Sequence, residues 1–249
     1  KSLIMNGEET YTDTIKIISE FFKKRSTERH YNNIQLLPDK DKFNWIIHKS
    51  KLATLKLNIE MPYEDMYNEA YNLLHEFYDH RAYGEPNTGW KSLVIHGRGK
   101  HLTLGDDQYD LTKLPDYHWT EVCNKCPITT NFLKNDIPLN EFLRIRFMLL
   151  EPGGYIIPHS DDDCDRLQTF NLALNQPENC IMGMENYGIV PWQIGDFRMM
   201  NITPEHAVWN KSNIPRIHII IHGYVYEDKE HEFKKCVIDS YNRLLNEYK

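Results

Sequence analysis

The segment around His159 carries side chains that suit a metal ion. It reads LLEPGGYIIPHSDDDCDRLQTF from Leu149 to Phe170, and its apolar part ends at His159, Ser160 and a run of aspartates. His159 and Asp161 are separated by one residue, so an extended strand places both side chains on one face, where they can donate a nitrogen and an oxygen to one cation. Taken alone, the pair is more typical of a polar turn after a strand, because a chain with 12 histidines contains such a pair by chance.

A second histidine turns the pair into a recognisable metal site. Two histidines and one carboxylate form a facial triad that leaves three positions open for other ligands. His206 follows a turn that contains Pro204, at the start of the strand-like segment HAVWN. His218 and His222 compete for the role, but both lie within the next apolar segment. We expect His206 to be the third ligand, because strand ends reach the mouth of a barrel.

Arg216 follows His206 after ten residues and begins the last apolar segment. A guanidinium that faces inward in an apolar β unit carries a large desolvation cost unless an anion pairs with it. Its planar fork fits a carboxylate through two parallel hydrogen bonds. An isolated arginine at a strand end is usually paired with a nearby Asp or Glu. With metal-ligand candidates in the same segment, we expect Arg216 to hold a dicarboxylate against the metal.

Short strands dominate the chain from Phe142 onward. The apolar or alternating segments are FLRIRFMLLE, LQTFNLAL, CIMGME, VPWQI, DFRMMN, HAVWN and RIHIIIHGYVY, and ENYG and IGD resemble hairpin turns between them. In FLRIRFMLLE, alternation places Arg144, Arg146, Met148 and Leu150 on one face and Ile145, Phe147 and Leu149 on the other. So many strands with almost no helix between them predict an antiparallel sandwich or barrel, a mainly β core with flanking helices.

Helical spacing occurs on both sides of this core. The segments with an apolar stripe are Asp13 to Arg25, Pro62 to Tyr83, Thr129 to Lys134 and Glu227 to Lys249, and GWKSLVIHG at Gly89 to Gly97 is typical of a strand. We therefore predict a single domain over 1–249, with a mainly helical part at about 1–135, a β core at about 140–226 and a C-terminal helix at about 227–249. Residues 106–126 carry mixed signals and are left unassigned.

Composition narrows the class of partner. The net charge of −7 disfavours nucleic acid and anionic membranes as partners, and no apolar run approaches the roughly 18 residues of a membrane span. The five cysteines are scattered, which favours the reducing cytoplasm. Cys123 and Cys126 form a C-x-x-C pair without a second pair nearby, so we interpret them as ordinary thiols. Asp162, Asp163 and Asp165 fit a solvated loop.

Three segments together resemble one enzyme family. RIRFMLLEPGGYIIPHSD, NLALNQPENC and WQIGDFRMMNITPEHAVWNKSNIPRIHIIIHG are similar to aspartyl/asparaginyl β-hydroxylases, which belong to the 2-oxoglutarate- and Fe(II)-dependent oxygenases. The resemblance covers roughly Arg144 to Gly223. It implies a double-stranded β-helix of the jelly-roll type and a dioxygenase that uses Fe(II), 2-oxoglutarate and O2 to hydroxylate an unactivated C–H bond, with release of succinate and CO2.

The resemblance also assigns site residues. His159, Asp161 and His206 match the iron ligands, and Arg216 matches the arginine that anchors the distal carboxylate of 2-oxoglutarate. Asn171 falls at a polar cosubstrate contact, although the family often has histidine there, and Thr169 stands where an arginine is common. The implied substrate is a free amino acid, a peptidyl Asp or Asn, or a similar small molecule.

Two other functions fit part of the pattern. A cupin-like metalloenzyme that does not use 2-oxoglutarate would need the metal ligands but not Arg216. A non-catalytic β-helix binding domain would need neither a complete triad nor Arg216. Succinate formation distinguishes the oxygenase from both alternatives.

Overall fold

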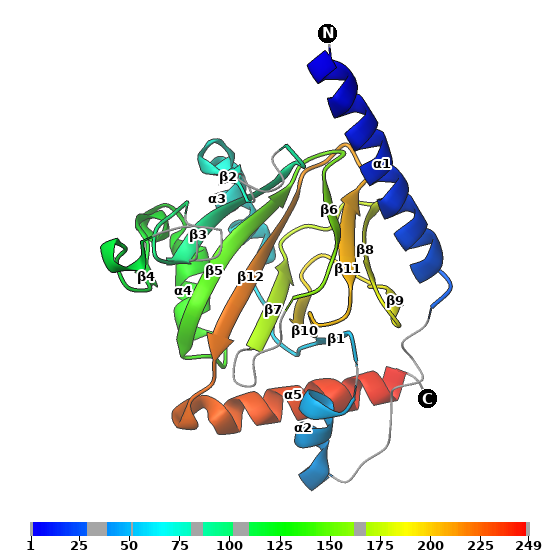
Figure 1. Cartoon of the computed structure of the whole chain (residues 1–249). Helices are drawn as coiled ribbons and strands as arrows, with labels where there is room; N and C mark the ends of the chain where they lie inside the picture. Colours follow the sequence, from blue (N-terminus) through cyan, green and yellow to red (C-terminus); the bar gives the residue numbers. More distant parts are fainter. Residues whose placement is uncertain are drawn as a thin grey trace.

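The computed structural model shows two antiparallel β-sheets that face each other, with helices on their outer sides (Figure 1). It describes residues 2–28, 39–50, 52–80, 87–101, 110–161 and 168–247. The helices are α1 (Ser2–Arg25), α2 (Asp39–His48), α3 (Tyr63–Asn72), α4 (Pro127–Asn135) and α5 (Glu227–Glu247), with short 3-10 helices at Leu74–Glu76, Leu111–Lys113 and Glu121–Lys125.

The strands alternate between the two sheets along the second half of the chain. They are β1 (Thr54–Lys56), β2 (Tyr78–Asp79), β3 (Trp90–Gly97), β4 (His118–Trp119), β5 (Glu141–Leu150), β6 (Tyr155–His159), β7 (Gln168–Ala173), β8 (Cys180–Met184), β9 (Gly188–Ile189), β10 (Phe197–Met200), β11 (His206–Asn210) and β12 (Arg216–Tyr224). The large sheet has the order β1-β10-β7-β12-β5-β3-β2, with β4 beside β3, and the small sheet has the order β6-β11-β8-β9. This arrangement confirms the predicted double-stranded β-helix with flanking helices.

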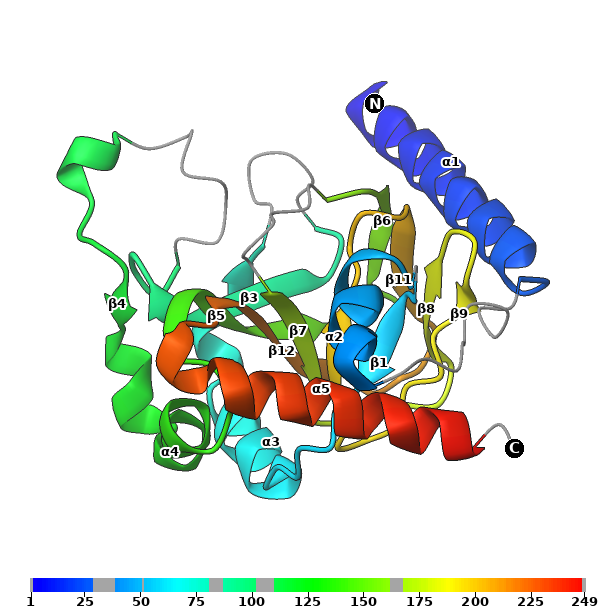
Figure 2. The same ribbon diagram turned by 90° about the horizontal axis from the view of Figure 1, so that it is seen from below.

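The outer face of the large sheet forms the main core. Ile217, Ile219 and Ile221 on β12 are fully buried there, and so are Ile145 and Phe147 on β5. Helices α3, α4 and α5 supply the other half of this core, and Figure 2 shows α5 crossing beneath the strands. Because side chains alternate along a strand, the even-numbered residues of β12 must point the other way, toward the small sheet.

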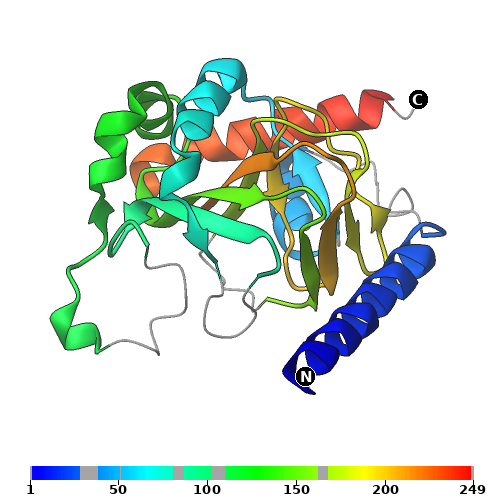
Figure 3. The same ribbon diagram turned by 90° about the horizontal axis from the view of Figure 1, so that it is seen from above.

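Helix α1 covers the outer face of the small sheet. Its Ile18, Phe21 and Phe22 pack with Ala207 of β11 and with neighbouring apolar side chains of β6, β8 and β9. Figure 3 shows α1 on the flank opposite α3, α4 and α5. Both sheets therefore have helix-covered outer faces, and the site must lie on their inner faces.

A glycine turn and one asparagine fix the small sheet against the large one. The turn between β5 and β6 has Gly153 at φ +76°, and a Cβ on Gly154 would lie 2.9 Å from the carbonyl oxygen of Glu151. The fully buried Asn210 donates to the carbonyls of Leu150 and Ile214 at 3.0 and 2.8 Å, and its backbone exchanges hydrogen bonds with the turn. These contacts hold β6 in register beside β11.

Three sequence expectations were wrong in detail. The helix expected over 62–83 ends at Asn72, because Tyr78 and Asp79 instead pair with β3, where strand hydrogen bonds outweigh helical spacing. The segment VPWQI is not a strand: Val190 bonds back to Met182, and a turn at Gly195 leads into β10. Strand β1 comes from the part expected to be mainly helical and was not predicted, whereas β3 confirms the strand predicted at Gly89 to Gly97.

Several expectations concern residues outside the described ranges. These are the end of the expected helix at 81–84, residues 106–109 of the unassigned segment, and the loop aspartates Asp162, Asp163 and Asp165. In the described remainder of 106–126, two 3-10 helices flank the short strand β4.

Candidate active site

His159, Asp161 and His206 meet at the inner end of the small sheet. His159 ends β6, His206 begins β11, and the two are directly paired across these strands. Their ring centroids lie 4.4 Å apart. The Oδ2 atom of Asp161 lies 3.7 Å from Nε2 of His159 and 3.6 Å from Nε2 of His206. In the part of the chain that the structure describes, these are the one group of three such side chains close enough to share a metal ion.

Backbone carbonyls orient both imidazole rings. Nδ1 of His159 lies 2.8 Å from the carbonyl oxygen of Ile157, and Nδ1 of His206 lies 2.9 Å from that of Pro204. A carbonyl can only accept, so each Nδ1 carries the proton and each Nε2 presents a lone pair toward Asp161. Metal-binding histidines in proteins usually have their tautomer fixed in this way, by a hydrogen bond from the ring nitrogen that does not face the metal.

The donor set fits a divalent transition metal such as Fe(II). The carboxylate-to-imidazole distances are too long for hydrogen bonds, so the three groups converge without bonding one another. Metal bonds of about 2.1 Å that meet at right angles would bring the donors to roughly 3 Å, a small contraction from the observed spacing. The set of two nitrogens and one carboxylate is that of a facial triad, which leaves coordination positions open.

Arg216 lies at the start of β12 with its side chain between the sheets. It is 4% exposed, and its Nε atom is buried without a hydrogen-bond partner. Burial lowers the pKa of Arg216 below its ordinary value, partly offset by the nearby Cys180. Among the described residues, no Asp or Glu oxygen lies within 4.0 Å of this guanidinium. The described residues therefore leave this buried cation without an anionic partner.

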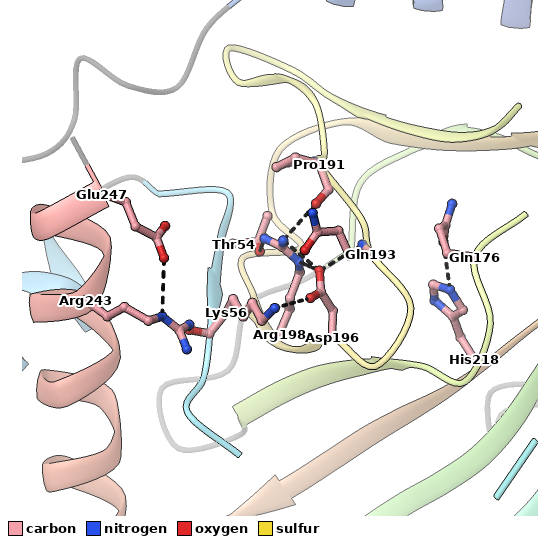
Figure 4. Close-up of polar contacts among 10 residues, drawn as sticks. All are labelled: Thr54, Lys56, Gln176, Pro191, Gln193, Asp196, Arg198, His218, Arg243 and Glu247. Atoms are coloured by element: carbon pink, nitrogen blue, oxygen red, sulfur yellow. Dashed lines mark hydrogen bonds and ion pairs between the residues drawn. The ribbon is translucent and has the colours of Figure 1, made fainter. Parts of the chain in front are cut away.

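The charge of a second buried arginine, Arg198, is balanced by a carboxylate of the chain. Arg198 on β10 forms an ion pair with Asp196 at 2.7 Å, and Lys56 contacts the other carboxylate oxygen at 2.8 Å. Arg198 also donates to Thr54 and to the carbonyl of Pro191 (Figure 4). This cluster is complete within the chain and holds β1 against β10. Among the described residues, no carboxylate stands in this relation to Arg216, although both arginines are buried.

His218 is a partner of Arg216 and not a metal ligand. Nη2 of Arg216 lies 3.1 Å from Nδ1 of His218, and the amide oxygen of Asn171 lies 2.8 Å from the same nitrogen. Its Nε2 lies 3.1 Å from the amide oxygen of Gln176 (Figure 4). Burial, and secondarily Arg216, hold the pKa of His218 well below 6.5, so the ring is neutral. The structure therefore places Asn171 one contact away from Arg216.

Further along the inner face, His222 lies between two arginines. Nη2 of Arg146 approaches Nδ1 of His222 to 3.4 Å, and His222 pairs with Arg144 across β5 and β12. Burial lowers the pKa of His222 to about 3, and the charges of Arg146 and Arg144 act in the same direction. The imidazole is therefore neutral at physiological pH.

The depressed pKa of His222 predicts an acid-sensitive fold. The unfolded chain binds a proton on this imidazole near pH 6.5, whereas the folded chain does so only near pH 3. The free energy of unfolding should therefore fall as pH falls below 6.5, by up to about 1.4 kcal/mol per pH unit from this group. When the free energy of unfolding is measured by urea titration between pH 7 and 5, it should fall less steeply with falling pH in His222→Gln than in the wild type. The exposed His75→Gln should keep the wild-type slope, and an equally steep slope in His222→Gln would contradict the assignment.

Sequence analysis missed one residue beside a candidate metal ligand and two residues that adjoin it. Trp90 on β3 lies with its ring centroid 6.4 Å from that of His159. The ring of His80 packs 4.2 Å from Trp90, and its Nδ1 bonds the hydroxyl of Ser92 at 2.9 Å. The predicted strand GWKSLVIHG could have indicated Trp90, because this residue begins β3 and β3 lies in the same sheet as Arg216. No spacing marked His80.

The C-x-x-C pair behaves as predicted from its isolation. Cys123 and Cys126 are free thiols, and burial raises the pKa of Cys126 to about 12. Burial also raises the pKa of Cys123. Both sulfurs are therefore protonated, which suits neither metal binding nor redox exchange.

The model of the aspartyl/asparaginyl beta-hydroxylase family matches residues 59–224, about two-thirds of the chain. The chain belongs to this family. The match includes the metal triad, Arg216 and strand β3, so it begins well upstream of the segments that first suggested it. Membership makes the protein a hydroxylase of the 2-oxoglutarate-dependent class.

Solved structures resemble this hydroxylase only distantly. An oxidoreductase of the 2OG-Fe(II) oxygenase family from Burkholderia pseudomallei is 10% identical, with a TM-score of 0.45 over 77% of this chain and 92% of that one. A prolyl-4-hydroxylase from Pseudomonas putida is 15% identical, with a TM-score of 0.44 over 75% of this chain and 98% of that one. No curated protein matches the sequence. None of the described helices is long and apolar enough to cross a membrane.

Proposed function

We propose that this hydroxylase uses Fe(II), 2-oxoglutarate and O2 to hydroxylate an unactivated C–H bond of an amino acid, a peptidyl Asp or Asn, or a similar small substrate. One observation carries the proposal: a facial triad and a buried arginine, which has no carboxylate partner among the described residues, lie on the inner faces of the two sheets. A metal site alone would fit a cupin-like enzyme equally well. The buried cation adds a requirement for a dicarboxylate.

The chain supplies binding groups for both cofactors. His159 and His206 would hold Fe(II) through Nε2, and Asp161 would hold it through its carboxylate. When bound, iron and 2-oxoglutarate supply with O2 the oxidising power for C–H hydroxylation, and 2-oxoglutarate is converted to succinate and CO2. Arg216 would receive the distal carboxylate of 2-oxoglutarate, where its unbonded Nε offers a donor.

Arg216 is held for this task by neutral neighbours. His218 contacts its Nη2, and Gln176 and Asn171 contact His218, so the guanidinium is positioned without being neutralised. A carboxylate in place of His218 would satisfy Arg216 within the chain and compete with the cosubstrate. The inner cluster of apolar residues that includes Leu150, Ile156 and Val208 excludes water from the space beside this pair.

Succinate formation tests the proposal. The iron-loaded protein, given 2-oxoglutarate and O2, should form succinate slowly without substrate and faster with a suitable amino acid or peptide. Asp161→Ala should abolish the reaction, and Lys16→Gln on the exposed surface of α1 should not change it. Bound iron without succinate from any substrate would favour the cupin-like alternative.

We propose the cytoplasm as the location of the protein. The described cysteines are free thiols, which agrees with a reducing compartment.

A further inference from the structure

The imidazole of His218 lies between Arg216 and a glutamine of the segment that follows β7. Its Nδ1 atom lies 3.1 Å from Nη2 of Arg216. Its Nε2 atom lies 3.1 Å from the amide oxygen of Gln176 (Figure 4). His218 is fully buried, so bulk water cannot replace either partner. Which ring nitrogen carries the proton therefore decides what the imidazole can do for Arg216.

The side-chain amide of Gln176 has one orientation, because the backbone fixes it. Its Nε2 atom donates to the carbonyl of Cys180 at 2.7 Å, which leaves the amide oxygen facing His218. The neighbouring Asn175 ties this segment to the backbone on both sides of Arg216, with hydrogen bonds of 2.9 and 2.7 Å. The amide oxygen of Gln176 is therefore a fixed acceptor beside the imidazole.

Arg216 and Gln176 require the same tautomer of His218. A guanidinium only donates, so Nδ1 must present a lone pair, and an amide oxygen only accepts, so Nε2 must carry the proton. The opposite tautomer would be repelled at both nitrogens, and turning Gln176 would set its oxygen against the carbonyl of Cys180. The amide of Asn171, 2.8 Å from Nδ1, fits this tautomer after a half-turn that presents its NH2 group.

Trp192 fixes the plane of the same imidazole. Its ring packs edge-to-face against His218, with the centroids 4.9 Å apart and the planes at 63°. The guanidinium of Arg198 lies 5.3 Å from the Trp192 ring and donates to the carbonyl of Pro191 at 2.8 Å, which holds this loop in place (Figure 4). The ring of His218 is thus held in its plane by Trp192 and in its tautomer by Gln176.

We propose that Gln176 is a positioning residue of the cosubstrate site. It keeps the proton of His218 on Nε2, so that Nδ1 accepts from Nη2 of Arg216 and holds the guanidinium in one orientation. The Nε atom of Arg216, which has no hydrogen-bond partner among the described residues, then remains available to a carboxylate. The assignment of that carboxylate to 2-oxoglutarate rests on the proposed function.

NMR of the histidine ring nitrogens in the metal-free protein tests the tautomer. A long-range proton–nitrogen spectrum distinguishes a protonated from an unprotonated ring nitrogen, and the signals of His218 are those that disappear in His218→Gln. We expect Nε2 to be protonated and Nδ1 to be unprotonated. A protonated Nδ1 would overturn the proposal. This measurement on the wild type requires no variant of Gln176.

The affinity for 2-oxoglutarate tests the effect on the site. The charge-transfer band is followed while 2-oxoglutarate is titrated anaerobically into the Fe(II)-loaded protein. Gln176→Met removes the amide at similar length and should raise the Kd about 2- to 10-fold, and His218→Leu should raise it about 10- to 100-fold, because the latter loses a hydrogen bond to a charged group. His218→Gln should recover part of the affinity, because its amide oxygen can accept from Arg216. The affinity for Fe(II) should not change.

A matched control and a folding check keep the outcomes distinct. Gln193→Met makes the same substitution at an exposed position of the neighbouring loop and should bind 2-oxoglutarate as the wild type does. Circular dichroism checks that each variant is folded. If folded Gln176→Met binds 2-oxoglutarate as tightly as Gln193→Met, the proposal is wrong. A wild type that binds iron but forms no band with 2-oxoglutarate would instead refute the proposed function, while the spectrum of the metal-free protein still decides the tautomer.

Discussion

Replacing His206 with alanine should abolish hydroxylation and weaken Fe(II) binding more than a hundredfold. Among the described residues, the imidazole is one of three donors that converge on the candidate site, and the other two are His159 and Asp161. Even residues that merely support a ligand typically change metal affinity about 10- to 100-fold, so loss of a ligand itself should exceed that range. Iron content after dialysis and the rate of succinate formation measure the two effects.

A matched control separates ligand loss from general damage. His206 is 6% exposed, so the variant should also be checked by thermal unfolding in the absence of metal. His75→Ala removes an imidazole whose side chain is 75% exposed on the short 3-10 helix after α3, and it should bind iron normally. If the folded His206→Ala protein bound iron as tightly as His75→Ala, the triad would be misassigned.

Replacing Arg216 with glutamine should raise the concentration of 2-oxoglutarate required for turnover by a large factor. Truncating one side of a buried, hydrogen-bonded charge pair costs about 2–5 kcal/mol of binding free energy. That range corresponds to roughly 30- to 4,000-fold in affinity. Arg216→Lys keeps a positive charge but loses the fork, so its KM for 2-oxoglutarate should lie between those of the wild type and Arg216→Gln.

The expected signature is selective for the cosubstrate. Fe(II) binding should be unchanged in both Arg216 variants, because no metal donor is removed. Folding should not suffer strongly from Arg216→Gln, because the described residues offer this buried cation no carboxylate that the substitution would leave unpaired. A KM for 2-oxoglutarate equal to that of the wild type would show that the cosubstrate is held elsewhere.

The sequence predicted the parts of the site that depend on local spacing. Alternation in FLRIRFMLLE placed Arg146 and Leu150 on the face opposite Ile145 and Phe147, and the structure buries Ile145 and Phe147 in the core that the helices cover. The one-residue spacing of His159 and Asp161 predicted that both side chains share one face, and their donor atoms lie 3.7 Å apart where β6 ends. These predictions succeeded because strand periodicity is a property of a few consecutive residues.

Contacts between distant segments were not accessible in the same way. The pairing of His206 with His159 depends on the turn that Gly153, Gly154 and Asn210 hold together, and no periodicity encodes that turn's position against β11. Similarly, the helix expected after Pro62 ends early because β3 offers Tyr78 and Asp79 a strand partner. The role of His218 was missed for the same reason, since only the fold brings Gln176 to its ring.

An anaerobic titration of the metal-free protein with Fe(II) and then 2-oxoglutarate would test the central claim most directly. The account predicts a visible metal-to-ligand charge-transfer band that forms only when both are present, saturates at one equivalent of iron, and depends on His206 and Arg216. Bound iron that gives no such band at any concentration of 2-oxoglutarate would contradict it.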